Sequence, residues 1–264
     1  MKQTSISDDA HYPEFCYNAA KHDEIFKNFR RYVVYRAIVE SCTDEEGMDY
    51  LEVILNDYDF KITDAQWKDI LLNDKLGNPI PCTYEFGNDV LTCSPMTLRY
   101  SKVFCDIVKL FDVNSLQTVT EVGVGYGGQC RILINALPIE RYNLVDLPEA
   151  LMLAEKFLTT LDTAGDIRYI DGTHLYNDLP CDLLISNYAF SELTKAVQKF
   201  YIDKIISKSK AGYMTWNYTA MKVYGGWREG YELEEILSMI PGSTTIPENP
   251  LISPGNCIIV WGFK

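Results

Sequence analysis

The sequence predicts an α/β fold in which a mostly parallel sheet ends in a C-terminal antiparallel hairpin and follows an N-terminal helical cap. From residue 118 onward, short β-branched segments alternate with amphipathic ones, which is typical of a parallel sheet with helices on both faces. A glycine-dense turn, GVGYGG, directly follows the first of these strands. The C-terminal stretch STTIPENPLISPGNCIIVWGFK instead indicates two strands joined by a turn at Pro254, Gly255 and Asn256.

Capping signals indicate where helices begin and end in the first part of the chain. Gln66 follows Thr63 at the spacing of a capping box, and Gly77 lies just past the end of that helix. Ser94 and Pro95 form an N-cap and a first helical residue. The predicted order is a polar arm at 1–20, helices at 23–42, 45–55 and from Thr63 onward, a loop with a short hairpin at 78–95, and a helix from Pro95 to about Phe111.

We expect two domains, a helical cap or lid at 1–95 and a ligand-binding α/β domain at 96–264. The alternation of patterns that defines the second domain gives five strands before the C-terminal hairpin. The strand candidates are 118–122, 142–146, 167–170, 181–186 and 211–216.

Composition limits the classes of function. The chain has 264 residues, 47% of them hydrophobic, which is typical of a globular protein. Its 24 basic and 37 acidic residues give a formal charge of −13, which argues against a nucleic-acid partner. The sequence has no apolar run of about 20 residues for a membrane span. With no apolar signal core near the N-terminus and no C-x-x-C pair among eight cysteines, we expect a cytoplasmic protein with reduced thiols.

The turn after the first strand predicts a ligand that contains a nucleoside. Glycine lets the backbone approach a ligand where a Cβ would block it. A strand, a glycine turn and a helix together present backbone N–H groups to that ligand. Asp146 ends the next strand, about 20 residues further on, where α/β folds offer a carboxylate to a ribose. The sequence therefore predicts a cofactor with an adenosine moiety.

The acidic residues around the turn help to identify this cofactor. Gly123, Gly125 and Gly128 satisfy the G-x-G-x-x-G pattern of NAD-binding folds, which alone is a weak signal. Glu121 also fits the E/D-x-G-x-G-x-G pattern of class I methyltransferases, and Asp171 after the third strand suits an adenine edge. Together with the C-terminal hairpin, these features favour S-adenosyl-L-methionine (SAM), with S-adenosyl-L-homocysteine (SAH) as product. The expected cofactor contacts are Glu121, Gly123, Gly125, Tyr126, Gly127, Gln129, Asp146, Leu147, Asp171, Gly172, Thr173, Asn187 and Tyr188.

Three segments carry a resemblance to a known family: GVGYGGQ, NLVDLPEAL and SNYAFSEL. Over about 119–193 the chain resembles the sugar O-methyltransferases of bacterial polysaccharide gene clusters, which are Rossmann-like class I SAM-dependent enzymes. The resemblance implies methylation of a hydroxyl on a capsule or lipopolysaccharide sugar, or on its activated precursor. Val124 replaces a further glycine of that family, which should only tighten the turn. The segment from Asn187 to Phe190 lacks both prolines of the N-P-P-Y/F box, which argues against base methylation.

A sugar hydroxyl is a poor nucleophile, so we expect a positioned general base. Glu192 is the first candidate, because it follows the fourth strand near the expected position of the methyl group. Alternatively, Ser191 caps the next helix and Glu192 is only an acid in its first turn. His174 is the second candidate, because histidine titrates in a useful pH range. His11 would matter only if the N-terminal arm folds over the site.

Aromatic and polar residues around Gly225 and Gly226 predict an acceptor site, since aromatic faces with a few polar donors hold pyranose rings. The alternative is an aromatic cluster of the core. We expect a sugar, nucleotide-sugar or capsule-precursor acceptor, and no metal, because Asp146, Asp171 and Glu192 lack a recognisable ligand spacing. The expected acceptor contacts are Arg99, Tyr100, Trp216, Asn217, Tyr224, Trp227 and Arg228.

Other functions stay open at this level. Tyr218 and Lys222 have the Tyr-x-x-x-Lys spacing of NAD-dependent nucleotide-sugar oxidoreductases and epimerases. Within methyl transfer, the acceptor could be a phosphoramidate or acid decoration of a capsule. A module that binds the cofactor without catalysis is a third reading, and the segment 1–80 could serve as a lid or as a homodimer interface.

Overall fold

The computed structural model describes residues 11–218 and 230–264, and their arrangement confirms the predicted α/β fold. In these residues, the main sheet has the order β5-β4-β3-β6-β7-β9-β8. Strand β9 runs antiparallel to both β7 and β8, whereas the other neighbouring pairs are parallel. The strands are β3 (Thr118–Val122), β4 (Arg141–Asp146), β5 (Asp166–Asp171), β6 (Cys181–Asn187), β7 (Ser209–Trp216), β8 (Thr244–Pro247) and β9 (Cys257–Trp261).

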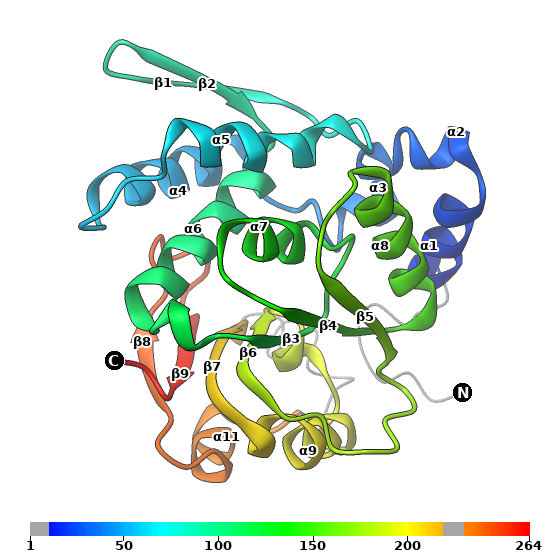
Figure 1. Cartoon of the computed structure of the whole chain (residues 1–264), viewed down its shortest axis with the longest axis vertical. Coiled ribbons are helices and arrows are strands. Elements are labelled where there is room, and N and C mark those ends of the chain that lie inside the picture. The colour runs from blue at the N-terminus through cyan, green and yellow to red at the C-terminus, as the bar shows by residue number, and fades with distance from the viewer. Residues whose placement is uncertain (1–10, 219–229) are drawn as a thin grey trace.

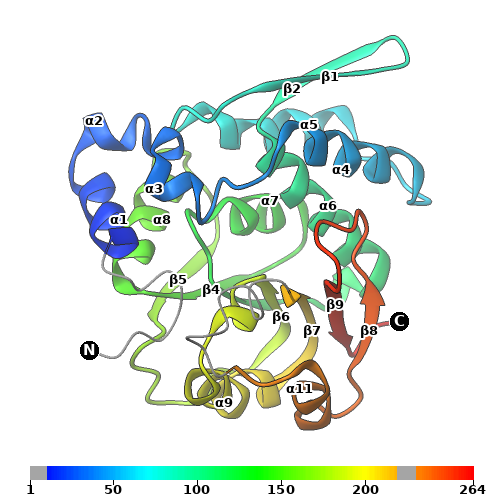
Figure 2. The same cartoon turned by 180° about the vertical axis from the view of Figure 1, so that it is seen from behind.

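Both faces of the sheet are covered by helices, which explains why the central strands are apolar along their whole length. Leu183 and Ile185 belong to the core on one face, and Leu184 between them belongs to the core on the other. Figures 1 and 2 show α6 (Pro95–Leu110), α7 (Gly128–Ala136) and α8 (Pro148–Thr160) on the first face. The second face carries α9 (Lys195–Lys204) and α11 (Leu233–Met239).

The N-terminal segment packs outside α6, α7 and α8, and shares their hydrophobic core. The predicted capping box at Thr63 and the N-cap at Ser94 are both confirmed, and a hairpin lies between them. The division into 1–95 and 96–264 stays a prediction. The elements are α1 (His11–Lys21), α2 (Asp23–Phe26), η2 (Phe29–Arg31), α3 (Val33–Arg36), α4 (Asp44–Asn56), α5 (Asp64–Ile70), η3 (Leu71–Lys75), β1 (Cys82–Phe86) and β2 (Asp89–Cys93).

Two predictions for this segment are wrong. Residues 11–20 belong to helix α1, which packs on α8 through Tyr12, Cys16 and Ala19. The continuous helix predicted at 23–42 is broken into short pieces. Arg30 is the physical reason: its guanidinium is fully buried and donates to Glu40, Asp74 and a backbone carbonyl, which fixes the chain locally. Tertiary packing has overridden the helical periodicity here.

The order of the strands creates the place for a ligand. From β3 the chain passes to β4 on one side, whereas β6 lies on the other side of β3. The loops that leave these strands therefore diverge and leave a crevice at the carboxyl ends of β3 and β6. Such a reversal of strand order is where open α/β sheets bind ligands.

Candidate active site

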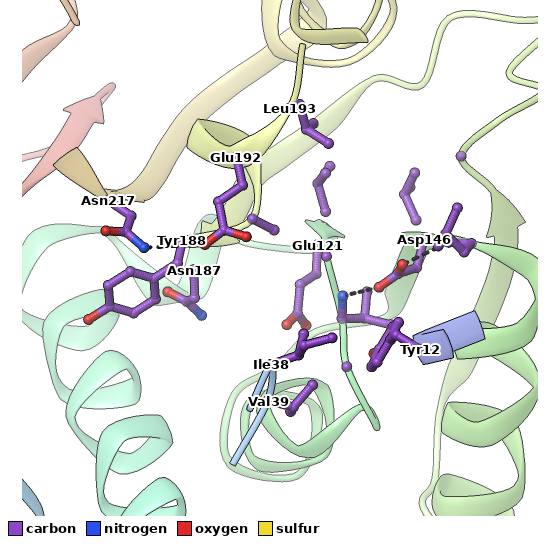
Figure 3. Close-up of a pocket in the computed structure, with 18 of the residues that line it drawn as sticks. Tyr12, Ile38, Val39, Glu121, Asp146, Asn187, Tyr188, Glu192, Leu193 and Asn217 are labelled. Atoms are coloured by element: carbon purple, nitrogen blue, oxygen red, sulfur yellow. Dashed lines mark hydrogen bonds between the residues drawn. The ribbon is translucent and has the colours of Figure 1, made fainter. Parts of the chain in front are cut away.

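A cavity of about 990 Å³ lies at these carboxyl ends. This volume is at the upper end for small-molecule sites, which leaves room for a cofactor and a second ligand. In Figure 3, Asp146 and Tyr12 lie at one end and Tyr188 and Asn217 at the other, with Glu121 between them. The N-terminal segment contributes Ile38 and Val39 to the wall opposite the sheet.

The glycine turn after β3 forms the middle of the cavity and needs its glycines. Gly123 and Gly125 have φ values of 79° and 56°, which other residues rarely adopt. A Cβ on Gly123 would lie 2.1 Å from the Cβ of Ala189, which leads out of β6. Gly125 faces Val39, whose Cγ1 would lie 3.0 Å from an added Cβ. The turn therefore holds two walls of the cavity close together.

Asp146, at the end of β4, joins the turn to the next loop. Its carboxylate accepts hydrogen bonds from the backbone N–H of Val124 and of Leu147, both at 2.7 Å. Burial raises the pKa of this carboxyl to about 6, although these backbone hydrogen bonds lower it. The turn thus forms with a valine at position 124, because the Val124 N–H contacts the Asp146 carboxylate.

Glu121 is a second acid of the cavity, and it is buried. Its side chain is 2% exposed, and the hydroxyl of Tyr142 donates to it at 2.8 Å. The pKa of Glu121 is raised to about 8, chiefly by burial; the hydrogen bond from Tyr142 opposes this rise, and the nearby charge of Asp146 adds to it. A protein bears the cost of such a group most often at a functional site.

The region beside Asp146 is apolar on one side. Gly172 donates its N–H to the Asp146 carbonyl at 2.9 Å, and both Gly172 and Thr173 line the cavity. A Cβ on Gly172 would lie 2.4 Å from the hydroxyl of Tyr201, so glycine allows α9 to approach. Leu147 from the β4 loop and Phe200 from α9 continue this wall. An aromatic ring next to the Asp146 carboxylate would fit these surfaces.

The opposite end of the cavity is polar. Asn217 Nδ2 donates to Glu192 Oε1 at 3.2 Å, and both side chains line the cavity with Asn187. Tyr188 has a φ of 67°, an uncommon value for a residue other than glycine. Its hydroxyl donates to Glu248, and the Arg99 guanidinium lies 4.6 Å from its ring centroid. A strained residue of this kind is often found at functional sites.

The structure corrects the capping role predicted for Ser191. Ser191 does not cap the next helix: its hydroxyl donates to the Tyr188 carbonyl at 2.7 Å, and α9 begins only at Lys195, after Thr194. Glu192 ends a short 3₁₀ helix, η5 (Phe190–Glu192), and lies on the cavity wall. Glu192 is therefore not in the first turn of α9, and its role as a base stays a prediction.

Thirteen of the predicted contacts line the cavity together, although they come from segments far apart in the sequence. They are Arg99, Tyr100, Glu121, Gly123, Gly125, Asp146, Leu147, Gly172, Thr173, Asn187, Tyr188, Glu192 and Asn217.

Tyr126, Gly127 and Gln129 are placed away from the cavity wall. Tyr126 is fully buried between the ring of Phe157, at 4.7 Å, and the guanidinium of Arg30, at the same distance. Gly127 is the N-cap of α7, and Gln129 donates to the carbonyl of Tyr100 at 3.3 Å. These residues fix the turn against the N-terminal segment, and we do not retain them as cofactor contacts.

Three further residues predicted as site contacts do not line the cavity. The His174 side chain is 65% exposed and lies beside Asp171 and Thr173, so it is too peripheral for a general base. Asp171 accepts from Thr173 N at 2.8 Å and positions that residue. Trp216 is 1% exposed in the core under α9, because alternate residues of β7 face that side. Tyr224, Trp227, Arg228 and Lys222 lie outside the described residues.

Comparisons with known proteins give structural likeness alone. No family model matches the sequence, and no curated protein matches it. An O-methyltransferase family protein from Burkholderia thailandensis is 15% identical with a TM-score of 0.46, covering 62% of this chain and 56% of its own length. The chain thus spans little more than half of that protein.

Two further solved structures give similar values. A SAM-dependent methyltransferase from Clostridium acetobutylicum is 13% identical with a TM-score of 0.46, covering 61% of this chain and 88% of its own. The N-methyltransferase NodS from Bradyrhizobium japonicum, in complex with SAH, is 12% identical with a TM-score of 0.44, covering 61% and 83%. None of these likenesses decides the reaction of this chain.

Several residues that line the cavity were not predicted as functional contacts. Tyr12 and His11 line the cavity because α1 folds over it, which meets the condition set for His11. Ile38 and Val39 enter from the broken helical region, and Ser253 from the loop before β9. Only contacts between distant segments bring these residues here. In the described part of the chain, no group of three or more His, Cys, Asp or Glu side chains could hold a metal, and no helix could span a membrane.

Proposed function

We propose that this protein is a SAM-dependent methyltransferase that transfers a methyl group to a hydroxyl of a sugar or sugar-derived acceptor. The observation that carries the proposal is the single cavity that joins the glycine turn and Asp146 to a polar end at Asn187, Glu192 and Asn217. One end suits a nucleoside, and the other suits an oxygen-rich acceptor. The resemblance of 119–193 to sugar O-methyltransferases of polysaccharide gene clusters supports the choice of acceptor, for capsule or lipopolysaccharide assembly.

The residues present fit SAM on several grounds. Gly123 and Gly125 form a cradle that a Cβ would fill. Asp146 offers a carboxylate to ribose hydroxyls, and Gly172, Leu147 and the α9 wall suit the adenine. Glu121, buried beyond the turn, suits the cationic methionine end.

The sheet favours this cofactor over NAD. A dinucleotide-binding sheet of the 3-2-1-4-5-6 type continues with a further strand outward from the fifth. Here an antiparallel β9 is inserted beside β7, which is the C-terminal hairpin expected from the sequence for class I methyltransferases. The tyrosine and lysine spacing that favoured an NAD-dependent enzyme is carried in part by Lys222, outside the described residues.

Bound SAM would supply an activated methyl group on a sulfonium, whose carbon–sulfur bond breaks as the bond from carbon to the acceptor oxygen forms. The protein must align the acceptor and remove the hydroxyl proton. We assign removal of this proton to Glu192, whose Oε1 accepts a hydrogen bond from Asn217 Nδ2 at 3.2 Å at the polar end of the cavity. Asn187 and Tyr188 would orient the acceptor, and the apolar residues of the N-terminal segment would exclude water.

Calorimetric titration with SAH and, separately, with NADH tests the cofactor. Wild-type protein should bind SAH and not NADH. Asp146→Ala should weaken SAH binding at least about 10-fold, because a hydrogen bond to a charged group contributes about 1.5–3 kcal/mol. Asp166→Ala, an exposed carboxylate at the start of β5, is the matched control and should leave the affinity unchanged. Binding of NADH alone would contradict the proposal.

A screen of nucleotide sugars with SAM tests the reaction, and Glu192→Gln tests the base. The variant should lower kcat about 10²–10⁴-fold, the usual contribution of general base catalysis, with SAH affinity unchanged. Glu155→Gln, exposed on α8, is the control. If kcat of Glu192→Gln equals that of the wild type, Glu192 is not the base.

A further inference from the structure

Arg99 is a buried cation at the acceptor end of the cavity. It projects from α6, is 9% exposed, and lines the cavity next to Tyr188. Its guanidinium lies 4.6 Å from the Tyr188 ring centroid and 5.9 Å from that of Tyr50. Of the cavity-lining residues in the described part of the chain, Arg99 is the only lysine or arginine.

The charge of Arg99 has no counterion within the described residues. The two other buried arginines both have one: Arg30 pairs with Glu40 at 2.7 Å, and Arg131 pairs with Asp69 at 2.7 Å. No carboxylate of the described residues makes an ion pair with Arg99. Burial of a charge is costly unless a partner compensates it, so this arginine differs from the structural ones.

The hydrogen bonds of Arg99 leave one edge of the guanidinium available. Nε donates to the Tyr50 hydroxyl at 3.2 Å, and Nη1 contacts the Met96 sulfur, a weak acceptor, at 3.7 Å. Among the described residues, Nη2 makes no hydrogen bond. The Tyr188 and Tyr50 rings and the hydrogen bond to the Tyr50 hydroxyl hold the guanidinium in place at the cavity wall, and Nη2 remains available to a ligand.

A second donor without a partner belongs to Asn187, which lines the same cavity. Asn187 Nδ2 is buried and has no hydrogen-bond partner in the described structure. Thr215 Oγ1 donates to Asn187 Oδ1 at 3.4 Å, and Nδ2 is the amide group left without a partner. Buried donors in native proteins are normally satisfied, which indicates a missing acceptor. Glu248, a further acid near Tyr188, already accepts hydrogen bonds from the Tyr188 hydroxyl and from the N–H of Ile252.

We propose that the acceptor carries an oxyanion, a carboxylate or a phosphate, which Arg99 binds through its free edge with help from Asn187. The inference rests on the proposed methyltransferase function and narrows its substrate class to acidic sugars and sugar phosphates. A planar guanidinium with two donors on one edge matches either oxyanion. Tyr188, strained under the guanidinium, positions it in the cavity.

The experiment titrates the protein with four probes: glucuronate, glucose 1-phosphate, glucose and inorganic phosphate. Titrations are followed by ligand-observed NMR, with and without saturating SAH, and against equal concentrations of sodium chloride. Wild-type protein should bind at least one sugar anion about 10- to 100-fold more tightly than glucose, as expected for charged hydrogen bonds. Preference for glucuronate identifies a carboxylate, and preference for glucose 1-phosphate or inorganic phosphate identifies a phosphate.

Arg99→Gln should remove this preference and leave SAH affinity unchanged, whereas Arg36→Gln, exposed on α3, should change neither. Arg99→Lys keeps the positive charge but lacks the paired N–H donors of the guanidinium, so it should keep part of the preference for anions over glucose. If Arg99→Gln does not fold, the comparison of anions with glucose on the wild type and the lysine variant decides. Equal binding of glucose and the anions, binding of no anion beyond the salt control, or an unchanged preference in a folded Arg99→Gln would each overturn the proposal. Failure of SAH to bind would instead refute the proposed function, since the anion titrations also run without it.

Discussion

Replacement of Glu121 by glutamine is expected to stabilise the protein near neutral pH. Glu121 is 2% exposed, and burial raises its pKa from an ordinary 4.5 to about 8. Glutamine is neutral and nearly the same shape, and its carbonyl can still accept the hydrogen bond from Tyr142. The substitution therefore removes the titration with little change in packing.

The sign and the size of the effect follow from the two pKa values. Between pH 4.5 and about 8, the folded protein holds a proton on Glu121 that the unfolded chain has released. Stability of the wild type therefore falls as the pH rises through this window. Each pH unit costs about 1.4 kcal/mol, so the loss is about 3 kcal/mol at pH 7 and about 5 kcal/mol above pH 8. The glutamine variant avoids this loss.

Urea unfolding without cofactor, at several pH values from about 5 to 8, measures the difference. The free energy of unfolding of Glu121→Gln should exceed that of the wild type by an amount that grows with pH. Taking this difference cancels the titration of acids that do not interact with Glu121, whereas the charge of Asp146 raises the Glu121 pKa and so contributes to the difference. Glu52→Gln, exposed on α4, is the matched control and should show a flat difference. A flat difference for Glu121→Gln, or a variant less stable than the wild type at pH 7, would refute the reasoning.

Three more substitutions and treatments have expected outcomes. Gly123→Ala should lower stability by about 1–3 kcal/mol and weaken SAH binding, because the new Cβ would lie 2.1 Å from the Cβ of Ala189. Gly242 has a similar φ of 76° but open space around it, so Gly242→Ala measures the backbone strain without the clash. Thermal unfolding compares the two variants. Trp216→Phe should lower stability by about 1–3 kcal/mol and leave the KM for the acceptor unchanged, since Trp216 lies in the core. A raised KM would indicate that Trp216 contacts the acceptor after all. EDTA should leave methyl transfer intact, and a loss that Mg²⁺ restores would overturn the expectation of no metal.

Elements that depend on neighbours in the sequence were predicted well. The first strand was predicted at 118–122, where β3 lies, and the other four central strands were predicted to within two residues at either end. The capping box at Thr63 and the N-cap at Ser94 were also correct. These features depend on side chains a few positions apart, so the local pattern is sufficient to predict them.

Orientation of side chains was predicted less well. Trp216 was expected at the acceptor, but it shares a face of β7 with Met214 and packs under α9. The alternation of β7 could have indicated this, since residues two apart face the same side. Tyr126 was expected at the cofactor, yet the N-terminal segment brings Arg30 over its ring. No local pattern predicts that contact, because Arg30 is almost 100 residues away.

Local residue patterns were sufficient to predict the α/β class, the strands, the glycine turn and the acids that precede and follow it. These features follow from periodicity, from glycine conformation and from spacing along one strand–turn–helix unit. Which side chains share the cavity depends instead on how distant segments pack. This packing brought Tyr12 beside Asp146, and it left Arg99 buried over Tyr188 with no counterion among the described residues. Desolvation and ion pairing depend on which distant segments pack against each other, and local residue patterns do not predict that packing.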